Sequence, residues 1–162
     1  MKRKHILTDI RFTSSYNNEE IGSLITTNYI KISRDLSVRQ AMRELIKEAG
    51  NHNNISTIYV VDQDDRFYGT IDLKDLIAAR KYDALDNIIT RSHPYLLDHE
   101  KISEKIEKIK EYAQDSLPVL TGEGKIIGIL TSRDMLEAID DEMGDDYAKL
   151  GGLTKEEDLK ET

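Results

Sequence analysis

The chain has 162 residues, a formal net charge of −8 and no cysteine. The acidity argues against a protein that follows nucleic-acid phosphates with a basic surface, and the lack of cysteine excludes disulfides and thiolate metal sites. No apolar run reaches the roughly 20 residues that span a bilayer, and Met1 to Lys4 do not lead into an apolar signal core. We therefore expect a soluble, cytoplasmic chain with no nucleic-acid partner.

The first half of the chain predicts a strand, a helix, two strands and a second helix. Ser37 and Gln40 have the spacing of a capping box, in which two side chains satisfy each other's backbone N–H groups at a helix start. Apolar residues then recur at helical spacing, at Val38, Ala41, Met42, Leu45 and Ile46. The remaining elements are a short strand over 29–32, strands over 57–61 and 67–71, and a helix with Leu73, Leu76 and Ile77.

The second half repeats this order of elements. A short strand over 95–97 precedes a helix whose apolar face holds Ile102, Ile106, Ile109 and Ala113. Strands over 117–120 and 126–130 follow, and a last helix begins near Thr131.

The two halves are copies of one unit of about 60 residues. Aligning Gly69 with Gly128 also aligns Asp75 with Asp134. A unit of this size alone buries only roughly 60% of its unfolded surface, so we expect the copies to share one core. The fold class is α/β (α+β), with two β-α-β-β-α units packed about a pseudo-two-fold axis. The expected parts are a lead-in segment over 1–23, domains over 24–83 and 84–143, and a connecting segment over 144–162.

The strand-to-helix junction of the second copy carries a family resemblance. The run Gly128-Ile129-Leu130-Thr131-Ser132-Arg133-Asp134 resembles the phosphate-and-ribose signature of CBS domains. The likeness to a CBS pair extends over roughly residues 24–140. It implies tandem CBS domains, also called a Bateman module, which is a regulatory unit that binds adenine nucleotides, and sometimes metal ions, between its two repeats.

Both flanks carry a narrower resemblance. Residues 19–27, EEIGSLITT, are similar to the segment that leads into the CBS pair of MgtE-type magnesium transporters, and residues 145–153 and 156–159 resemble that family's junction into its connecting plug helix. The resemblance implies a region at the cytosolic face of the cell membrane. Its partners in a full-length protein would be a superhelical N-domain and a five-helix membrane domain. We also expect a homodimer.

The CBS resemblance implies that Thr131 and Asp134 bind an adenine nucleotide such as ATP or AMP. A helix N-terminus offers unpaired N–H groups and a favourable dipole to an anion. The Thr131 hydroxyl can bond a phosphate, and the Asp134 carboxylate can accept from two ribose hydroxyls. The alternative is that both residues only cap their own helix. In the first copy, Asp72 stands at the hydroxyl position, where its charge would repel phosphate, so we expect it to cap a helix.

An acidic stripe follows along the predicted last helix. Its members lie at i, i+3, i+7 and i+11, at Asp134, Glu137, Asp141 and Asp145. Like charges one turn apart repel, so the stripe needs solvent or a cation, and Mg²⁺ prefers carboxylate and water oxygens. The MgtE resemblance implies Mg²⁺ ligands at Asp134, Glu137, Glu142, Asp145 and Asp146. The alternative is a solvated acidic face.

No pattern in the sequence supports catalysis. The histidines lie in predicted turns or near the termini, at His5, His52, His93 and His99, and no Walker loop, dinucleotide fingerprint or zinc-protease motif occurs. We therefore expect not an enzyme but the regulatory CBS pair of an MgtE-type transporter, in which Mg²⁺ gates ion transport and adenine nucleotide modulates it. The rival is a stand-alone adenine-nucleotide sensor that regulates a separate partner. A purely structural dimerisation module is a third alternative.

Overall fold

Two three-stranded sheets form the centre of the structure, a computed structural model that describes residues 16–144. The strands are β1 (Lys31–Ser33), β2 (Thr57–Val61), β3 (Phe67–Asp72), β4 (Leu96–Leu97), β5 (Leu117–Leu120) and β6 (Ile126–Leu130). In each sheet the first two strands are parallel and the last two antiparallel. The strands predicted over 57–61, 117–120 and 126–130 are confirmed, whereas β1 begins two residues later than predicted.

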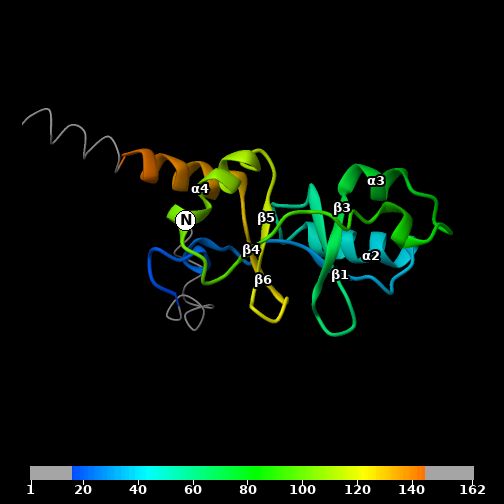
Figure 1. The fold of residues 1–162 in the computed structure, drawn as a ribbon. Coiled ribbons are helices and arrows are strands. Elements are labelled where there is room, and N and C mark those ends of the chain that lie inside the picture. The colour runs from blue at the N-terminus through cyan, green and yellow to red at the C-terminus, as the bar shows by residue number, and fades with distance from the viewer. Residues whose placement is uncertain (1–15, 145–162) are drawn as a thin grey trace, which may run out of the picture.

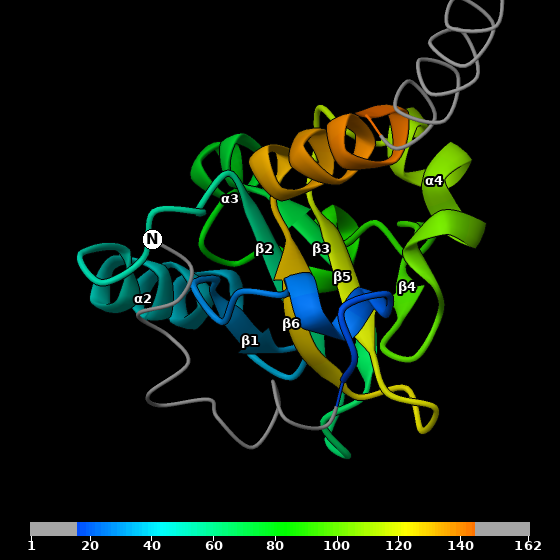
Figure 2. The same ribbon diagram turned by 90° about the vertical axis from the view of Figure 1, so that its left-hand side faces the viewer.

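Helices cover the outer face of each sheet (Figure 1). They are α2 (Val38–Ala49), α3 (Leu73–Ala78), α4 (Ile102–Glu111), a last helix over residues 132–144, and two 3-10 helices, η2 (Ile21–Leu24) and η3 (Leu85–Ile88). Figures 1 and 2 show α2 and α3 beside the first sheet, and α4 and the last helix beside the second. The predicted α+β class with two related units is confirmed. Within the described part of the chain, no helix combines the length and apolarity needed to cross a bilayer.

Local sequence explains where α2 begins and which side it buries. Ser37 Oγ accepts the N–H of Gln40 at 3.1 Å, and Gln40 Oε1 accepts the N–H of Ser37 at 2.9 Å, which confirms the predicted capping box. Val38 and Leu45 are buried, but Ile46 is 69% exposed. Ile46 belongs to the predicted apolar pattern but is not part of the core, because position i+8 lies about 80° around the helix from Val38, at the edge of the buried stripe.

A similar departure occurs in α3. Leu76 is fully buried, but Ile77, another apolar residue of the predicted helix, is 63% exposed. Adjacent helix positions lie about 100° apart, so a helix of this length that buries Leu76 against the sheet turns Ile77 away from it.

Each sheet is apolar on both faces because each face is covered. Along β2, Ile58 and Val60 pack on the helix side, while Tyr59 and Val61 pack on the side that faces the second sheet. Tyr59 is fully buried there, and its hydroxyl bonds the hydroxyl of Ser116. The core between the sheets therefore belongs to both halves, as the small size of the repeat predicted.

Each half also lends a segment to the other. Thr26 exchanges two backbone hydrogen bonds of 3.0 Å with Ile129 in β6, and Thr90 exchanges two, of 3.0 and 2.7 Å, with Thr70 in β3. The 3-10 helices follow the same exchange: η2 packs in the core of the second sheet and η3 in that of the first. The first sheet is therefore completed by the start of the second half, and the second sheet by the start of the first.

This exchange accounts for the two aligned glycines. A Cβ atom on Gly69 would lie 2.5 Å from the carbonyl oxygen of Thr90. A Cβ atom on Gly128 would lie 2.7 Å from Cβ of Ile25. Glycine is therefore needed where the segment from the other half crosses each sheet.

Candidate functional site

The strand-to-helix junction of the second half brings Thr131 and Asp134 together. Thr131 Oγ1 accepts the N–H of Asp134 at 3.1 Å, and Asp134 Oδ2 accepts the N–H of Thr131 at 3.5 Å. The capping alternative is thus formed in the structure. A hydroxyl that accepts one hydrogen bond still has a hydrogen to donate, so Thr131 keeps the chemistry needed to bond a phosphate oxygen.

Asp134 is enclosed by its surroundings. It is only 4% exposed and is followed by the fully buried Met135. The first turn of its helix is also tied to the turn that follows α4, because the Ser132 hydroxyl donates to the carbonyl of Ala113. A ligand that uses the Asp134 carboxylate must therefore reach an atom that is almost closed to solvent, so ribose contact requires a local opening of the junction.

The corresponding junction of the first half is different. Asp72 occupies the N-cap position of α3, but its side chain makes no capping hydrogen bond, so the expectation that it caps the helix is wrong. The N–H of Leu73, the first residue of α3, donates to the carbonyl of Ser56 at 2.9 Å. Asp75, the counterpart of Asp134, is exposed and lines an open depression of about 470 Å³ together with Asn87 and Thr90. The two halves thus share a scaffold but present different surfaces at these junctions.

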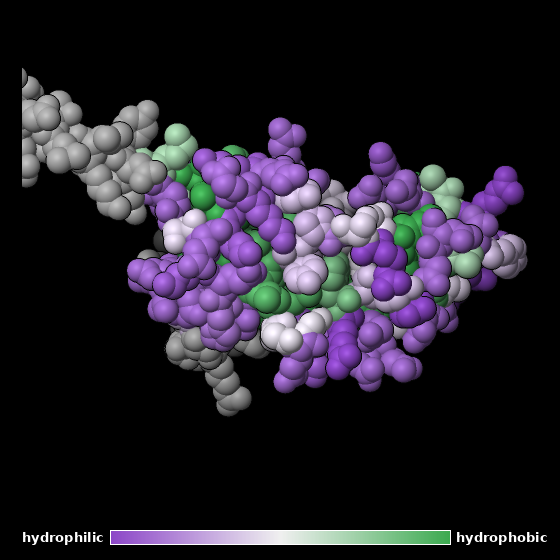
Figure 3. All heavy atoms as spheres, in the orientation of Figure 1, coloured by the Kyte–Doolittle hydropathy of each residue, from purple (hydrophilic) through white to green (hydrophobic). Residues whose placement is uncertain are grey.

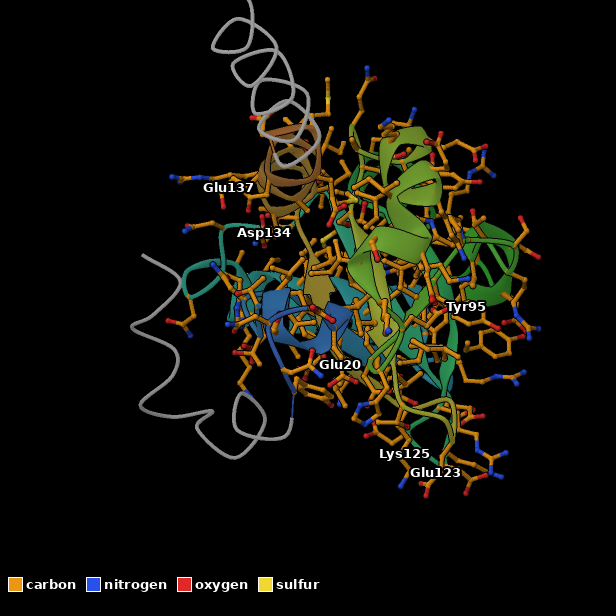
Figure 4. All side chains as sticks on the ribbon, turned by 60° about the vertical axis from the view of Figure 1, so that its left-hand side comes forward. Glu20, Tyr95, Glu123, Lys125, Asp134 and Glu137 are labelled. Carbon is orange, nitrogen blue, oxygen red and sulfur yellow. The ribbon has the colours of Figure 1, made fainter. Side chains whose placement is uncertain are left out.

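The acidic stripe is only partly within the described residues. Glu137 is exposed and pairs with Arg133, whose Nε lies 3.4 Å from Glu137 Oε1. Figure 4 shows Asp134 and Glu137 on the same side of the last helix, with Glu20 well away from them. Glu142 is half-buried in the same helix. The remaining two predicted ligands, Asp145 and Asp146, lie outside the described residues.

The carboxylates that are described suit Mg²⁺ in chemistry but do not complete a site. Between residues 16 and 144, no three His, Cys, Asp or Glu side chains are grouped so that they could hold a metal ion. Mg²⁺ usually takes only one or two carboxylates and keeps several waters, so Asp134 and Glu137 match its preferences as a partial set. Further ligands would have to come from elsewhere, and the predicted site stays a prediction.

A polar cluster that the sequence did not predict joins the lead-in segment to the second half. We call it the His99 cluster, and its members are Tyr16, Glu20, Asp98 and His99. His99 Nδ1 lies 2.7 Å from Glu20 Oε2, and His99 Nε2 lies 3.6 Å from Asp98 Oδ2. The Tyr16 hydroxyl donates to Asp98 Oδ2 at 2.9 Å. Because Glu20 and His99 are 79 positions apart, no local pattern could have revealed this contact.

The cluster shifts the protonation of its members. A hydrogen bond from the backbone of Asn17, and then the one from His99, lower the pKa of Glu20. The hydrogen bond to Glu20 raises the pKa of His99, and burial followed by the bond to Asp98 raises the pKa of Tyr16. Asp98 is itself 7% exposed, so the cluster holds a nearly buried carboxylate next to an exposed imidazole.

Comparison with known proteins decides what the repeat is. The family model of the CBS domain matches residues 21–82 and, a second time, residues 85–141. The chain belongs to the CBS-domain family. The two matches coincide with the two sheets and their helices, so the structure is that of a CBS pair.

One group of relatives resembles this CBS pair and its flanks. Magnesium transporter MgtE of Thermus thermophilus is 29% identical over 145 residues, which are 90% of this chain and 32% of that relative. A crystal structure of the soluble part of a magnesium transporter has a TM-score of 0.77 and 27% identity, and covers 88% of this chain and 55% of its own. The cytosolic domain of the Mg²⁺ channel MgtE in complex with ATP has a TM-score of 0.73 and 28% identity, over 80% of this chain and 52% of its own. The CBS pair thus spans about a third of the curated relative that it matches.

Proposed function

We propose that this CBS pair is the regulatory region of an MgtE-type magnesium transporter, in which Mg²⁺ binding to acidic residues gates ion transport at the cytosolic face of the membrane. The role is regulatory rather than catalytic. The observation that carries the proposal is the acidic side of the last helix, where the exposed Glu137 lies on the same side as the nearly buried Asp134 (Figure 4). This helix lies in a chain of which 90% aligns with the magnesium transporter MgtE of Thermus thermophilus.

The mechanism follows from charge repulsion. Carboxylates that face each other across an interface repel, and Mg²⁺ held between them by one or two carboxylates and several waters removes that repulsion. Mg²⁺ then binds the compact, closed arrangement more tightly than the extended one and shifts the population towards it. In the absence of Mg²⁺, Arg133 neutralises part of the charge of Glu137, so the ion has to compete with this pair.

A homodimer would supply the facing surface. Ile77 in α3 and Leu136 in the last helix are 63% and 52% exposed, and each directly follows a fully buried residue at the equivalent place in its half. Figures 1 and 2 show α3 and the last helix at the same edge of the molecule. The face drawn in Figure 3 is mainly hydrophilic, with apolar atoms gathered in smaller areas. Because apolar side chains gathered at one edge mark association surfaces, we propose the dimer contact at the edge of Ile77 and Leu136.

Small-angle scattering across millimolar Mg²⁺, with dimerisation measured on the same samples, tests the gating proposal. Mg²⁺ should make the wild-type dimer more compact and raise its melting temperature. The double variant Glu137→Gln, Asp145→Asn should lose both responses. A matched control, Glu104→Gln with Glu111→Gln, removes the same charge from exposed positions of α4 and should respond like wild type. The proposal would be refuted if adding Mg²⁺ changed neither the shape, nor the dimerisation, nor the melting temperature of the wild-type protein.

Adenine-nucleotide sensing is the second candidate function. It is favoured by the intact Thr131–Asp134 pair and by a similar cytosolic MgtE domain that was solved in complex with ATP. A ligand at about 100 times its Kd stabilises the folded state by about 2.7 kcal/mol, so ATP, ADP or AMP should raise the melting temperature measurably. Asp134→Asn should abolish this shift, whereas Asp75→Asn, its counterpart in the first half, should retain it.

The pattern of responses separates the candidates. A response to nucleotide but not to Mg²⁺ favours a stand-alone sensor that regulates a separate partner. Responses to both favour a transporter region whose Mg²⁺ sensing is modulated by nucleotide. A protein that dimerises but responds to neither ligand is a structural dimerisation module.

A further inference from the structure

The His99 cluster lies where the described part of the lead-in segment, residues 16–23, is attached to the second CBS domain. Backbone bonds flank the cluster: the N–H groups of Ile21 and Gly22 donate to the carbonyls of Glu100 and Asp98, both at 2.8 Å. Ile21 is fully buried in the core of the second sheet, and the Tyr16 ring lies against Gly22. Any change in the cluster therefore acts on how firmly the lead-in segment is held.

From this geometry we propose that His99 is a proton-operated clamp, which holds the lead-in segment on the second CBS domain when the imidazole is protonated and loosens it when the proton leaves. The clamp does not depend on magnesium transport or on nucleotide binding. It requires only that the imidazole bridges two carboxylates, one from each of the segments that it joins.

The number of N–H donors on the ring explains the switch. The imidazolium form has N–H groups on both ring nitrogens, so it can hydrogen-bond Glu20 through Nδ1 and attract Asp98 electrostatically from Nε2 at the same time. Neutral imidazole has one N–H and one lone pair, so one ring nitrogen then directs its lone pair at a carboxylate oxygen. Loss of the proton removes one attraction, replaces it with a repulsion and leaves two carboxylates without their shared cation.

Other titratable groups near the ring have partners of their own or stay neutral. Glu100, which follows His99 in the chain, is paired with Lys105 at 2.8 Å. Tyr16 remains a neutral donor to Asp98 because its pKa is raised. The titratable groups of the lead-in segment, the turn and the start of α4 around the ring are Tyr16, Glu19, Glu20, Asp98, Glu100, Lys101 and Lys105.

The direction of the pH effect follows from these contacts. The pKa of His99 is raised by Glu20, so the clamp is complete below the ordinary histidine pKa of about 6.5 and is lost as the pH rises through the raised value. Glu20, whose pKa is lowered, keeps its charge throughout this window. Acidification should therefore tighten the lead-in segment and alkalinisation should loosen it.

Amide hydrogen exchange on the full chain, corrected for the intrinsic effect of pH, tests the clamp. The reporter amides are those of Ile21, Gly22 and Ile102, and the amides of β2 serve as an internal reference. Between about pH 5.5 and about pH 8, protection of the reporters should fall about two- to fivefold relative to β2, because an exposed ion pair contributes only modestly. In the variants His99→Gln and Glu20→Gln, the protection of the reporter amides relative to the β2 amides should not change with pH.

A matched control uses another imidazole–carboxylate pair, which is partly buried. His52 Nε2 lies 3.3 Å from Glu48 Oε2 within the first half, so His52→Gln should leave the pH dependence of the three reporters unchanged. NMR titration provides a second readout, in which Glu20→Gln lowers the pKa of His99 towards its ordinary value. The proposal is overturned if wild-type protection of the reporters does not vary with pH, or if His99→Gln keeps the wild-type dependence.

Discussion

Replacing Gly69 with alanine should destabilise the protein strongly. The segment that contains Ile89 and Thr90, at the start of the second half, crosses the first sheet at Gly69. The new Cβ would lie 2.5 Å from the carbonyl oxygen of Thr90 and 2.7 Å from Cγ2 of Ile89. Thr90 is held by two backbone hydrogen bonds to Thr70, so its carbonyl cannot move away without breaking them. The substitution thus forces a choice between a close contact and the loss of the bridge that links the two halves.

The size of the effect can be estimated from these contacts. Overpacking costs about 1–3 kcal/mol, and each lost hydrogen bond adds about 0.5–1.5 kcal/mol, so we expect Gly69→Ala to lose about 3 kcal/mol of unfolding free energy. At about 3 °C per kcal/mol for a chain of this size, the melting temperature should fall by about 9 °C. At Gly128 the nearest atoms belong to the Ile25 side chain, which can partly adjust, so Gly128→Ala should lose only about 1–2 kcal/mol.

Urea and thermal unfolding followed by circular dichroism would measure these differences. Gly122→Ala is the control, because a Cβ there would meet no atom within 4 Å and the substitution should be neutral or stabilise by up to about 1 kcal/mol. If Gly69→Ala unfolds within about 0.5 kcal/mol of Gly122→Ala, the crossing segment is not packed as described and the reasoning is refuted.

Three further outcomes are expected. Ser37→Ala removes the capping box of α2 and should lower the unfolding free energy by about 1 kcal/mol in urea, whereas an unchanged midpoint would show that the cap is not formed in solution. Tyr59→Phe removes the buried bond to Ser116 and should lose about 1 kcal/mol, and a more stable variant would contradict this. Burial raises the pKa of Tyr29 from 10.0 to about 12, so its contribution to stability is complete below pH 10.0 and is lost as the pH rises towards about 12. Absorbance titration of tyrosinate should therefore show that Tyr29→Phe removes a late-titrating group and unfolds at higher pH than wild type.

Several parts of the fold could be predicted because their causes are local. The capping box at Ser37 depends on residues three positions apart, and strands β2, β5 and β6 are short apolar runs bounded by polar turns. Errors arose where burial depended on a neighbour in space. Ile46 and Ile77 continue apolar helical patterns but are exposed, and Asp72 makes no capping hydrogen bond although it occupies the N-cap position of α3.

The candidate sites also combine local features, which the sequence predicted, with features that depend on residues distant in the sequence. The pairing of Thr131 with Asp134 followed from their spacing at a helix start, but the enclosure of Asp134 and the exposure of Asp75 did not. Equivalent sequence positions acquire different surroundings because different segments cover them. The ion pair of Glu137 with Arg133 is local in sequence, whereas a Mg²⁺ site needs ligands brought together from several places.

Sequence alone determined the duplication, the order of strands and helices in each copy, and the family to which the repeat belongs. These features depend on periodicity, on turn and capping residues, and on short motifs, which act over a few neighbouring positions. Only the tertiary structure decided that each half completes the other's sheet, why Gly69 and Gly128 have no side chain, and that His99 bridges Glu20 and Asp98. Those contacts join residues far apart in the chain, and they form only when packing of the shared core offsets the loss of chain entropy on closing such long loops.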